Sequence, residues 1–140
     1  MEDLQRYAIR IRKAMNKTRR EINNVLQTQT HFELKQPQLH LLTYISEHEP
    51  CKITDLAKKF EVNPSTISTM INKFVQDGFV IREYSKDDRR NVFVTVTDQG
   101  KHVLSRELEN YNKVVGQYLS RLNKTELETL LNILEKMAES

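Results

Sequence analysis

Four consecutive charged residues, Asp87, Asp88, Arg89 and Arg90, form the cluster whose types and spacing could do chemistry. Two adjacent carboxylates beside two guanidinium groups could serve as general acid and base if a pocket held them. At the tip of a turn, the same four residues would instead grip another molecule. The structure that flanks the cluster therefore decides between the two interpretations.

The other reactive side chains form no catalytic or metal-binding pattern. The four histidines are dispersed, without the paired spacing of a helical metal site: His31, His40, His48 and His102. Cys51 is the only cysteine, which excludes an internal disulfide, and we interpret it as a small, partly buried residue rather than a redox switch. There is no Ser, His, Asp order of a nucleophile site and no Gly-rich phosphate loop. We therefore expect neither an enzyme nor a metal or cofactor site.

Composition is typical of one helix-rich globular domain. The chain has 140 residues, of which 38% are hydrophobic and 29% charged, with few glycines and prolines. The formal net charge of +3 is compatible with nucleic-acid binding but indicates it only weakly. The first residues, MEDLQRYAIRIRK, contain no apolar run, so we expect a cytoplasmic protein without a membrane span.

Apolar spacing between residues 37 and 78 predicts three short helices. The first begins near Pro37 and the second at Thr54. Asn63 as a cap, followed by Pro64 in the first turn, begins the third helix, and Gly78 ends it. Because a short link at residues 61–63 joins the last two helices, they form a helix-turn-helix candidate.

Two strands with a turn between them follow the third helix. Residues 79–81 form the first strand, and the turn lies around residues 85–88. Val92, Val94 and Val96 then alternate with other residues in the period of a half-buried strand. The charged cluster therefore lies at the tip of a hairpin.

Both ends of the chain are predicted to be helical. Apolar residues from Leu4 to Val25 and from Leu104 to Leu122 alternate steps of four and three, and Asn123 with Glu126 can cap a last helix. The stripes on these helices could pack in an intramolecular bundle or against a second copy of the chain.

A helix-turn-helix followed by a basic-tipped hairpin is the winged-helix arrangement, and the residues resemble the multiple antibiotic resistance regulator (MarR) family. The segment Ile53-Thr54-Asp55-Leu56-Ala57 and a recognition helix at residues 65–76 carry part of the resemblance. The rest lies in the run DDRRNVFVTVTDQG, where Asp88, Arg90, Thr97 and Gly100 match the wing pattern of the family and Val96 replaces its usual Leu.

The resemblance implies a fold that is mainly α with a small β-hairpin wing. Residues 1–140 would form a single MarR-type domain. Residues 33–100 would be the winged helix-turn-helix DNA-binding region, and residues 1–32 and 101–140 the helical dimerisation region.

The resemblance also implies roles for the charged cluster, because it predicts that Arg90 enters the minor groove and that Asp88 holds its guanidinium or the loop in shape. On the recognition helix, hydroxyl and amide side chains suit base edges, and Asn72 could pair with adenine. Thr69 stands where many members have a basic residue, which shifts the expected readout to Arg89, Arg90 and DNA shape. The predicted DNA-binding residues are Ser65, Thr66, Ser68, Thr69, Asn72, Lys73, Asp88, Arg89 and Arg90.

The expected function is that of a homodimeric transcriptional regulator, a repressor that binds a pseudo-palindromic operator. A small-molecule effector in the crevice between the dimerisation and DNA-binding helices is expected to release the operator. The alternative is a protein-interaction adaptor that keeps the fold without DNA binding.

Overall fold

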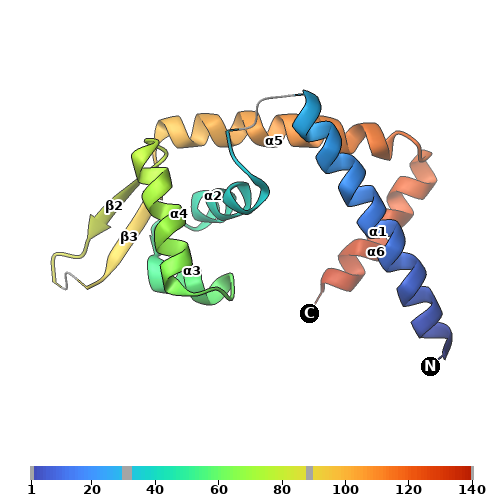
Figure 1. The fold of residues 1–140 in the computed structure, drawn as a ribbon, viewed down its shortest axis with the longest axis horizontal. Coiled ribbons are helices and arrows are strands. Elements are labelled where there is room, and N and C mark those ends of the chain that lie inside the picture. Colours follow the sequence, from blue (N-terminus) through green and yellow to red (C-terminus); the bar gives the residue numbers. More distant parts are fainter. Residues whose placement is uncertain (1, 30–32, 88–89, 140) are drawn as a thin grey trace. The chain divides into compact units, whose positions relative to one another are not determined.

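The computed structural model describes residues 2–29, 33–87 and 90–139, and it confirms a mainly helical chain with a small sheet (Figure 1). Its elements are, in order, α1 (Glu2–Gln29), α2 (Gln36–His48), β1 (Cys51–Lys52), α3 (Ile53–Lys59), α4 (Pro64–Gln76), β2 (Val80–Tyr84), β3 (Val92–Val96), α5 (Asp98–Leu119) and α6 (Lys124–Ala138). Two compact units result: a winged unit, Glu33–Leu108, and a helical unit that combines Met1–Phe32 with Glu109–Ser140. Helix α5 contributes residues to both units.

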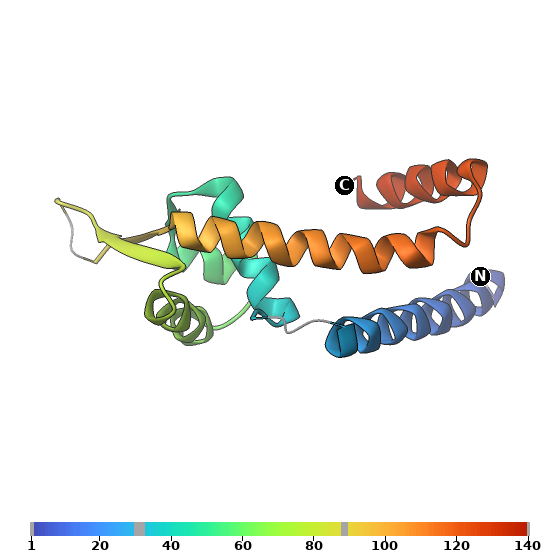
Figure 2. The ribbon, with the colours of Figure 1, turned by 90° about the horizontal axis from the view of Figure 1, so that it is seen from above.

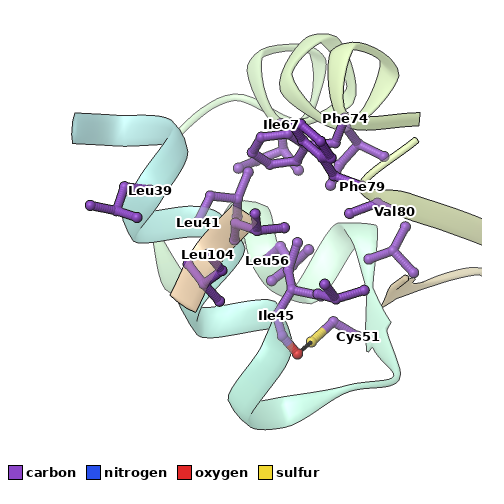
Figure 3. Packing of buried hydrophobic residues seen from close by; sticks show 14 of the residues in the cluster. Leu39, Leu41, Ile45, Cys51, Leu56, Ile67, Phe74, Phe79, Val80 and Leu104 are labelled. Atoms are coloured by element: carbon purple, nitrogen blue, oxygen red, sulfur yellow. Dashed lines mark hydrogen bonds between the residues drawn. The ribbon is translucent and has the colours of Figure 1, made fainter. Parts of the chain in front are cut away.

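The winged unit has one hydrophobic core, which α2, α3, α4, the sheet and the first half of α5 surround (Figure 3). Ile45 of α2, Leu56 of α3 and Phe74 of α4 are almost fully buried in it. Ile67 and Ile71 are buried on the same face of α4, as the helical period predicts. The core therefore fixes which face of α4 is left for solvent.

The predicted helix signals are confirmed. The Asn63 side chain accepts a hydrogen bond from the Ser65 backbone N–H at 3.2 Å, and Gly78, with φ of +82°, follows the end of α4. Asn123 and Glu126 form the predicted reciprocal cap of α6, with bonds of 2.8 and 3.0 Å. Leu122 lies outside α5, because the chain must leave the helix before Asn123 can take the extended backbone that a cap requires.

The sheet is antiparallel with the strand order β1-β3-β2. Val80 pairs with Val96 and Tyr84 with Val92, so β2 and β3 form the predicted hairpin, which projects beyond the helices of the winged unit (Figure 2). Cys51 pairs with Val94, so the sheet begins at residue 51.

A compact junction joins α4, the hairpin and α5. The Thr97 hydroxyl donates to the Gly78 carbonyl at 2.6 Å and accepts from the Gly100 N–H at 3.0 Å. A Cβ on Gly100 would lie 2.2 Å from the Phe79 carbonyl oxygen and 2.8 Å from Val96 Cγ1. The two residues that match the end of the wing pattern therefore have a structural role, because they let α5 begin directly against the sheet.

Glu33, at the start of the winged unit, is held to α5 by a hydrogen bond and an ion pair. Glu107 Oε1 accepts from the Glu33 N–H at 2.8 Å, and Arg106 pairs with the Glu33 carboxylate at 2.6 Å. The Glu107 side chain is almost fully buried, and its Oε2 has no hydrogen-bond partner in the described part of the chain. Burial, which disfavours the charged form, raises the pKa of this carboxyl.

The helical unit buries far less. Among its described residues Leu26 and Val114 are buried, and α6 has no buried residue. Within the described ranges, no helix is both long and apolar enough to span a membrane.

Replacing Gly100 with Ala should destabilise the fold by about 1 to 3 kcal/mol or more, because the new methyl group would clash with a backbone carbonyl that cannot rotate away. Gly116→Ala is the matched control within the same helix, since a Cβ there has no neighbour within 4 Å, and it should stabilise by about 1 kcal/mol. Denaturant titrations of both variants measure the difference. Parental stability of Gly100→Ala would show that the junction is not tightly packed.

Replacing Glu107 with Gln should stabilise the protein at pH 8, because burial disfavours the charged carboxylate that the parent must carry at this pH. The folded state favours the protonated carboxyl, so the parent loses stability as pH rises above the unfolded-state pKa of Glu107. Gln keeps the oxygen that accepts from Glu33 but cannot ionise.

Urea titrations should therefore show a higher free energy of unfolding for Glu107→Gln than for the parent at pH 8. This difference should be smaller at pH 4. Glu109→Gln, an exposed change on the same helix, is the matched control for the removal of a carboxylate from α5. An advantage of equal size at both pH values would mean that the ionisation of Glu107 does not limit stability.

Candidate nucleic-acid interface

Helix α4 presents the polar face that the sequence predicts for DNA recognition. Its buried residues hold one side against the core, and the opposite side is solvent-exposed. Of the predicted recognition residues, Ser65, Thr66, Thr69, Asn72 and Lys73 are exposed, and Ser68 is half-buried. The face thus offers short hydroxyl and amide groups with one cation, the chemistry that suits base edges and phosphates.

Two of these side chains already have partners within the helix. The Thr69 hydroxyl donates to the Ser65 carbonyl at 2.9 Å, so Thr69 can offer DNA an oxygen lone pair but not its proton. Lys73 Nζ lies 3.3 Å from Asp77 Oδ1, one turn further along α4, and the Lys73 side chain is 57% exposed. Phosphate would therefore compete with Asp77 for this ammonium group.

Asp87 and Arg90, the described members of the charged cluster, lie in the turn between β2 and β3. The Ser85 N–H donates to the Asn91 carbonyl at 3.1 Å and closes the loop, and the Asp87 N–H donates to Ser85 Oγ at 3.3 Å. Arg90 is exposed. Asp88 and Arg89 lie outside the described residues, and so does the predicted contact between Asp88 and Arg90.

Arg82 is a member of this surface that the sequence analysis missed. Its Nη2 donates a hydrogen bond to Asn72 Oδ1 and so connects β2 with α4. Arg82 is half-buried, and its cross-strand neighbour Val94 is buried. A signal was present, because Arg82 shares a strand face with the buried Val80, and a charged group on such a face needs a partner.

Cys51 lies in the core rather than at this surface (Figure 3). Its Sγ is 4.0 Å from the Ile45 carbonyl oxygen. Burial, followed by the negative charges of Glu49 and Asp55, raises the pKa of the thiol, which disfavours the reactive thiolate. This environment favours the interpretation of Cys51 as a packing residue.

No group of three or more His, Cys, Asp or Glu side chains is arranged to hold a metal ion within residues 2–29, 33–87 and 90–139. His31 lies outside these ranges. His40 contacts Phe60 edge-on and His48 stacks on Tyr44, so two of the histidines have aromatic neighbours.

Comparison with known proteins agrees with the geometry. The MarR family model matches residues 34–92. YwhA of Bacillus subtilis, an uncharacterized HTH-type transcriptional regulator, is 31% identical over 99 residues, which cover 71% of each chain. The HTH-type transcriptional repressor MdtR of the same organism is 27% identical over 103 residues, covering 74% of this chain and 66% of MdtR.

Among solved structures, FabT of Streptococcus pneumoniae in complex with DNA has a similar fold. Its TM-score is 0.75 at 18% identity, with 93% of this chain and 94% of FabT covered. The expected resemblance is thereby confirmed: the chain belongs to the MarR family and is a winged-helix, DNA-binding transcriptional regulator.

Proposed function

We propose that the protein is a homodimeric repressor that binds a pseudo-palindromic operator and releases it when a small molecule binds. The observation that carries this proposal is the arrangement of the winged unit, in which an exposed polar helix and an Arg-tipped hairpin share one junction at Thr97 and Gly100. The relative MdtR is named a transcriptional repressor, which supports repression rather than activation.

In this proposal the exposed face of α4 reads the major groove, and Ser65, Thr66, Ser68, Thr69, Asn72 and Lys73 contribute base or phosphate contacts. Arg90 enters the adjacent minor groove, where an arginine gains from the enhanced negative potential. Asp88 and Arg89 assist it from the same loop.

Exposed apolar side chains on the helical unit support assembly into a dimer. Leu4 is 70% exposed on α1 and Met137 72% on α6. Other large apolar residues that are at least partly exposed on these two helices are Tyr7, Ile9, Ile11, Met15, Leu131, Ile133 and Leu134. So much apolar surface is unusual for a monomer, and a second copy is the partner that a two-fold regulator requires. We therefore propose residues 1–32 and 101–140 as the dimerisation region and residues 33–100 as the DNA-binding region.

For the effector we propose a different place from the crevice between the dimerisation and DNA-binding helices that the sequence suggested, namely a pocket of about 400 Å³ within the winged unit. It is lined by Pro37 and His40 of α2, by Phe60 and Val62 before α4, and by Thr66 and Met70 of α4. A compact, largely apolar compound in this cavity would touch the recognition helix directly, and it would release DNA if it preferred a shifted position of α4. If a compound releases the operator from the parent, Met70→Trp, which fills the cavity, should abolish that response.

Replacing Arg90 with Ala should weaken operator binding by about 1 to 3 kcal/mol and leave the fold intact, because an arginine exposed at the hairpin turn lies outside the hydrophobic core. Arg90→Lys separates two explanations. A groove contact needs the planar guanidinium, so Lys should bind almost as weakly as Ala, whereas a simple phosphate contact would be restored by Lys. Parental affinity of Arg90→Ala in a mobility-shift titration at fixed salt would contradict the role of the wing.

The symmetry of the operator tests the dimer and the function together. Selection of genomic fragments by the purified full-length protein should enrich an inverted repeat with half-site centres about 10 base pairs apart, because a two-fold dimer presents two recognition helices one DNA turn apart. Light scattering should show a dimer at micromolar concentration. An asymmetric site with a monomeric protein would refute the dimer, and absence of any salt-dependent DNA affinity would favour the adaptor.

A further inference from the structure

Helix α1 carries a row of cations along one side. Residues 4–20 contain seven Lys or Arg and no Asp or Glu. Five of the seven recur at steps of four and three residues, the spacing that places side chains on one face of a helix. These five, the basic row, are Arg6, Arg10, Lys13, Lys17 and Arg20, and all of them are exposed. The basic row extends over about 21 Å of the helix axis.

The cations of the basic row have no acidic partner within the described part of the chain. Ion pairs across one helical turn join Lys73 with Asp77 on α4 and Lys113 with Glu109 on α5, and no ion pair between described residues involves α1. Positions one turn apart in the basic row instead hold like charges, which repel each other. The chain has 22 Lys and Arg against 19 Asp and Glu, so without the seven cations of residues 4–20 its formal net charge would be −4 rather than +3. Positive charge is therefore concentrated on α1.

The basic row lies on the side of α1 that faces away from its apolar residues. At about 100° per residue, the centre of the basic row is roughly 190° from the centre of the apolar seam. The apolar seam consists of Leu4, Ala8, Ile11, Met15 and Ile22. A helix that lies on a membrane buries its apolar face at the headgroup boundary, with its cations beside that face. The two faces of α1 cannot contact one bilayer surface together, so the arrangement favours a polyanion that needs only the cations.

Duplex DNA presents the array of anions that the basic row requires. Over about 21 Å of duplex, each strand carries about six phosphates. Guanidinium and ammonium groups both bind phosphate, and such contacts depend on no particular base sequence. The chain belongs to a family of DNA-binding regulators, so DNA is a polyanion that this protein meets.

We propose that the basic row of α1 is a second DNA-binding surface, which contacts phosphates of duplex DNA outside the operator. This inference goes beyond the proposed function, because α4 and the hairpin account for operator recognition and the basic row belongs to the helical unit. Flanking DNA on the same duplex and a second duplex offer the same phosphates, and the experiment separates them.

The experiment compares two matched double variants of the full-length protein. Lys13→Gln with Lys17→Gln removes two cations of the basic row, and Lys124→Gln with Lys136→Gln removes two exposed cations of α6, so the net charge changes equally. Gln has nearly the helix propensity of Lys, so both variants should fold, which circular dichroism and light scattering check.

Two measurements distinguish the sources of the phosphates. The first is the affinity for a long duplex of random sequence at increasing salt. Each phosphate contact contributes about 0.9 to the slope of log affinity against log salt, so if flanking DNA is bound, the α1 variant should have a slope lower by about 2 than the α6 variant. The second is the capture of a labelled duplex by a duplex fixed on beads. If a second duplex is bound, the α1 variant should bridge the two roughly tenfold less well than the α6 variant.

A difference between the variants in either measurement supports the inference and identifies the source. Equal behaviour of the two variants in both measurements would overturn it, and so would a parent without affinity for the random duplex. Vesicles that contain phosphatidylglycerol are the third arm, in which binding that only the α1 variant loses, with equal behaviour on DNA, would make a membrane surface the partner instead. None of these measurements needs the operator, so a parent that selects no operator sequence would refute the proposed function and leave this test in force.

Discussion

The junction at Thr97 and Gly100 is the constraint on which the winged unit depends. The Thr97 hydroxyl donates to the Gly78 carbonyl, after the end of α4, and accepts from the Gly100 N–H in the first turn of α5. Because Gly100 has no side chain, α5 can approach the Phe79 carbonyl. Glu49 adds a third attachment, because its carboxylate accepts from the Val96 N–H at 2.7 Å and pairs with Lys101 at 3.0 Å. Helix α4 and the hairpin are thus held by the same few atoms, so a change in the junction would move together the two elements that we propose to contact DNA.

The two units differ in how far they bury their apolar residues. In the winged unit, α2, α3 and α4 direct their apolar residues into one core, and the surface that remains on α4 is polar. In the helical unit, α1 and α6 keep most of their large apolar residues at least partly exposed. Burial of such surface is the main favourable contribution to folding and association. The winged unit can therefore be stable through its own contacts, whereas we expect the helical unit to depend on a second chain.

The sequence predicted those features whose cause lies within a few residues. Asn63 and Asn123 cap helices through bonds to residues two and three positions away, and the alternation of Val92, Val94 and Val96 follows from the strand period itself. Contacts between distant elements could not be found in this way. Arg82 and Asn72 are 10 residues apart on different elements, and Glu107 and Glu33 are 74 apart. Their pairing depends on how the helices pack, which local patterns do not specify.

Partners inside the protein also change what the predicted contact residues can do. Lys73 offers a positive charge, but Asp77 lies beside it on the exposed surface of α4. An exposed pair of this kind contributes only about 0 to 1 kcal/mol, whereas transfer of the ammonium to a DNA phosphate releases a condensed counterion from the duplex. Phosphate should therefore win the competition at low salt and lose part of its advantage as salt rises. Asn72 differs, because its partner Arg82 is half-buried and anchored on the sheet. In the proposed complex Lys73 would thus exchange Asp77 for a phosphate, whereas Asn72 would keep its contact with Arg82.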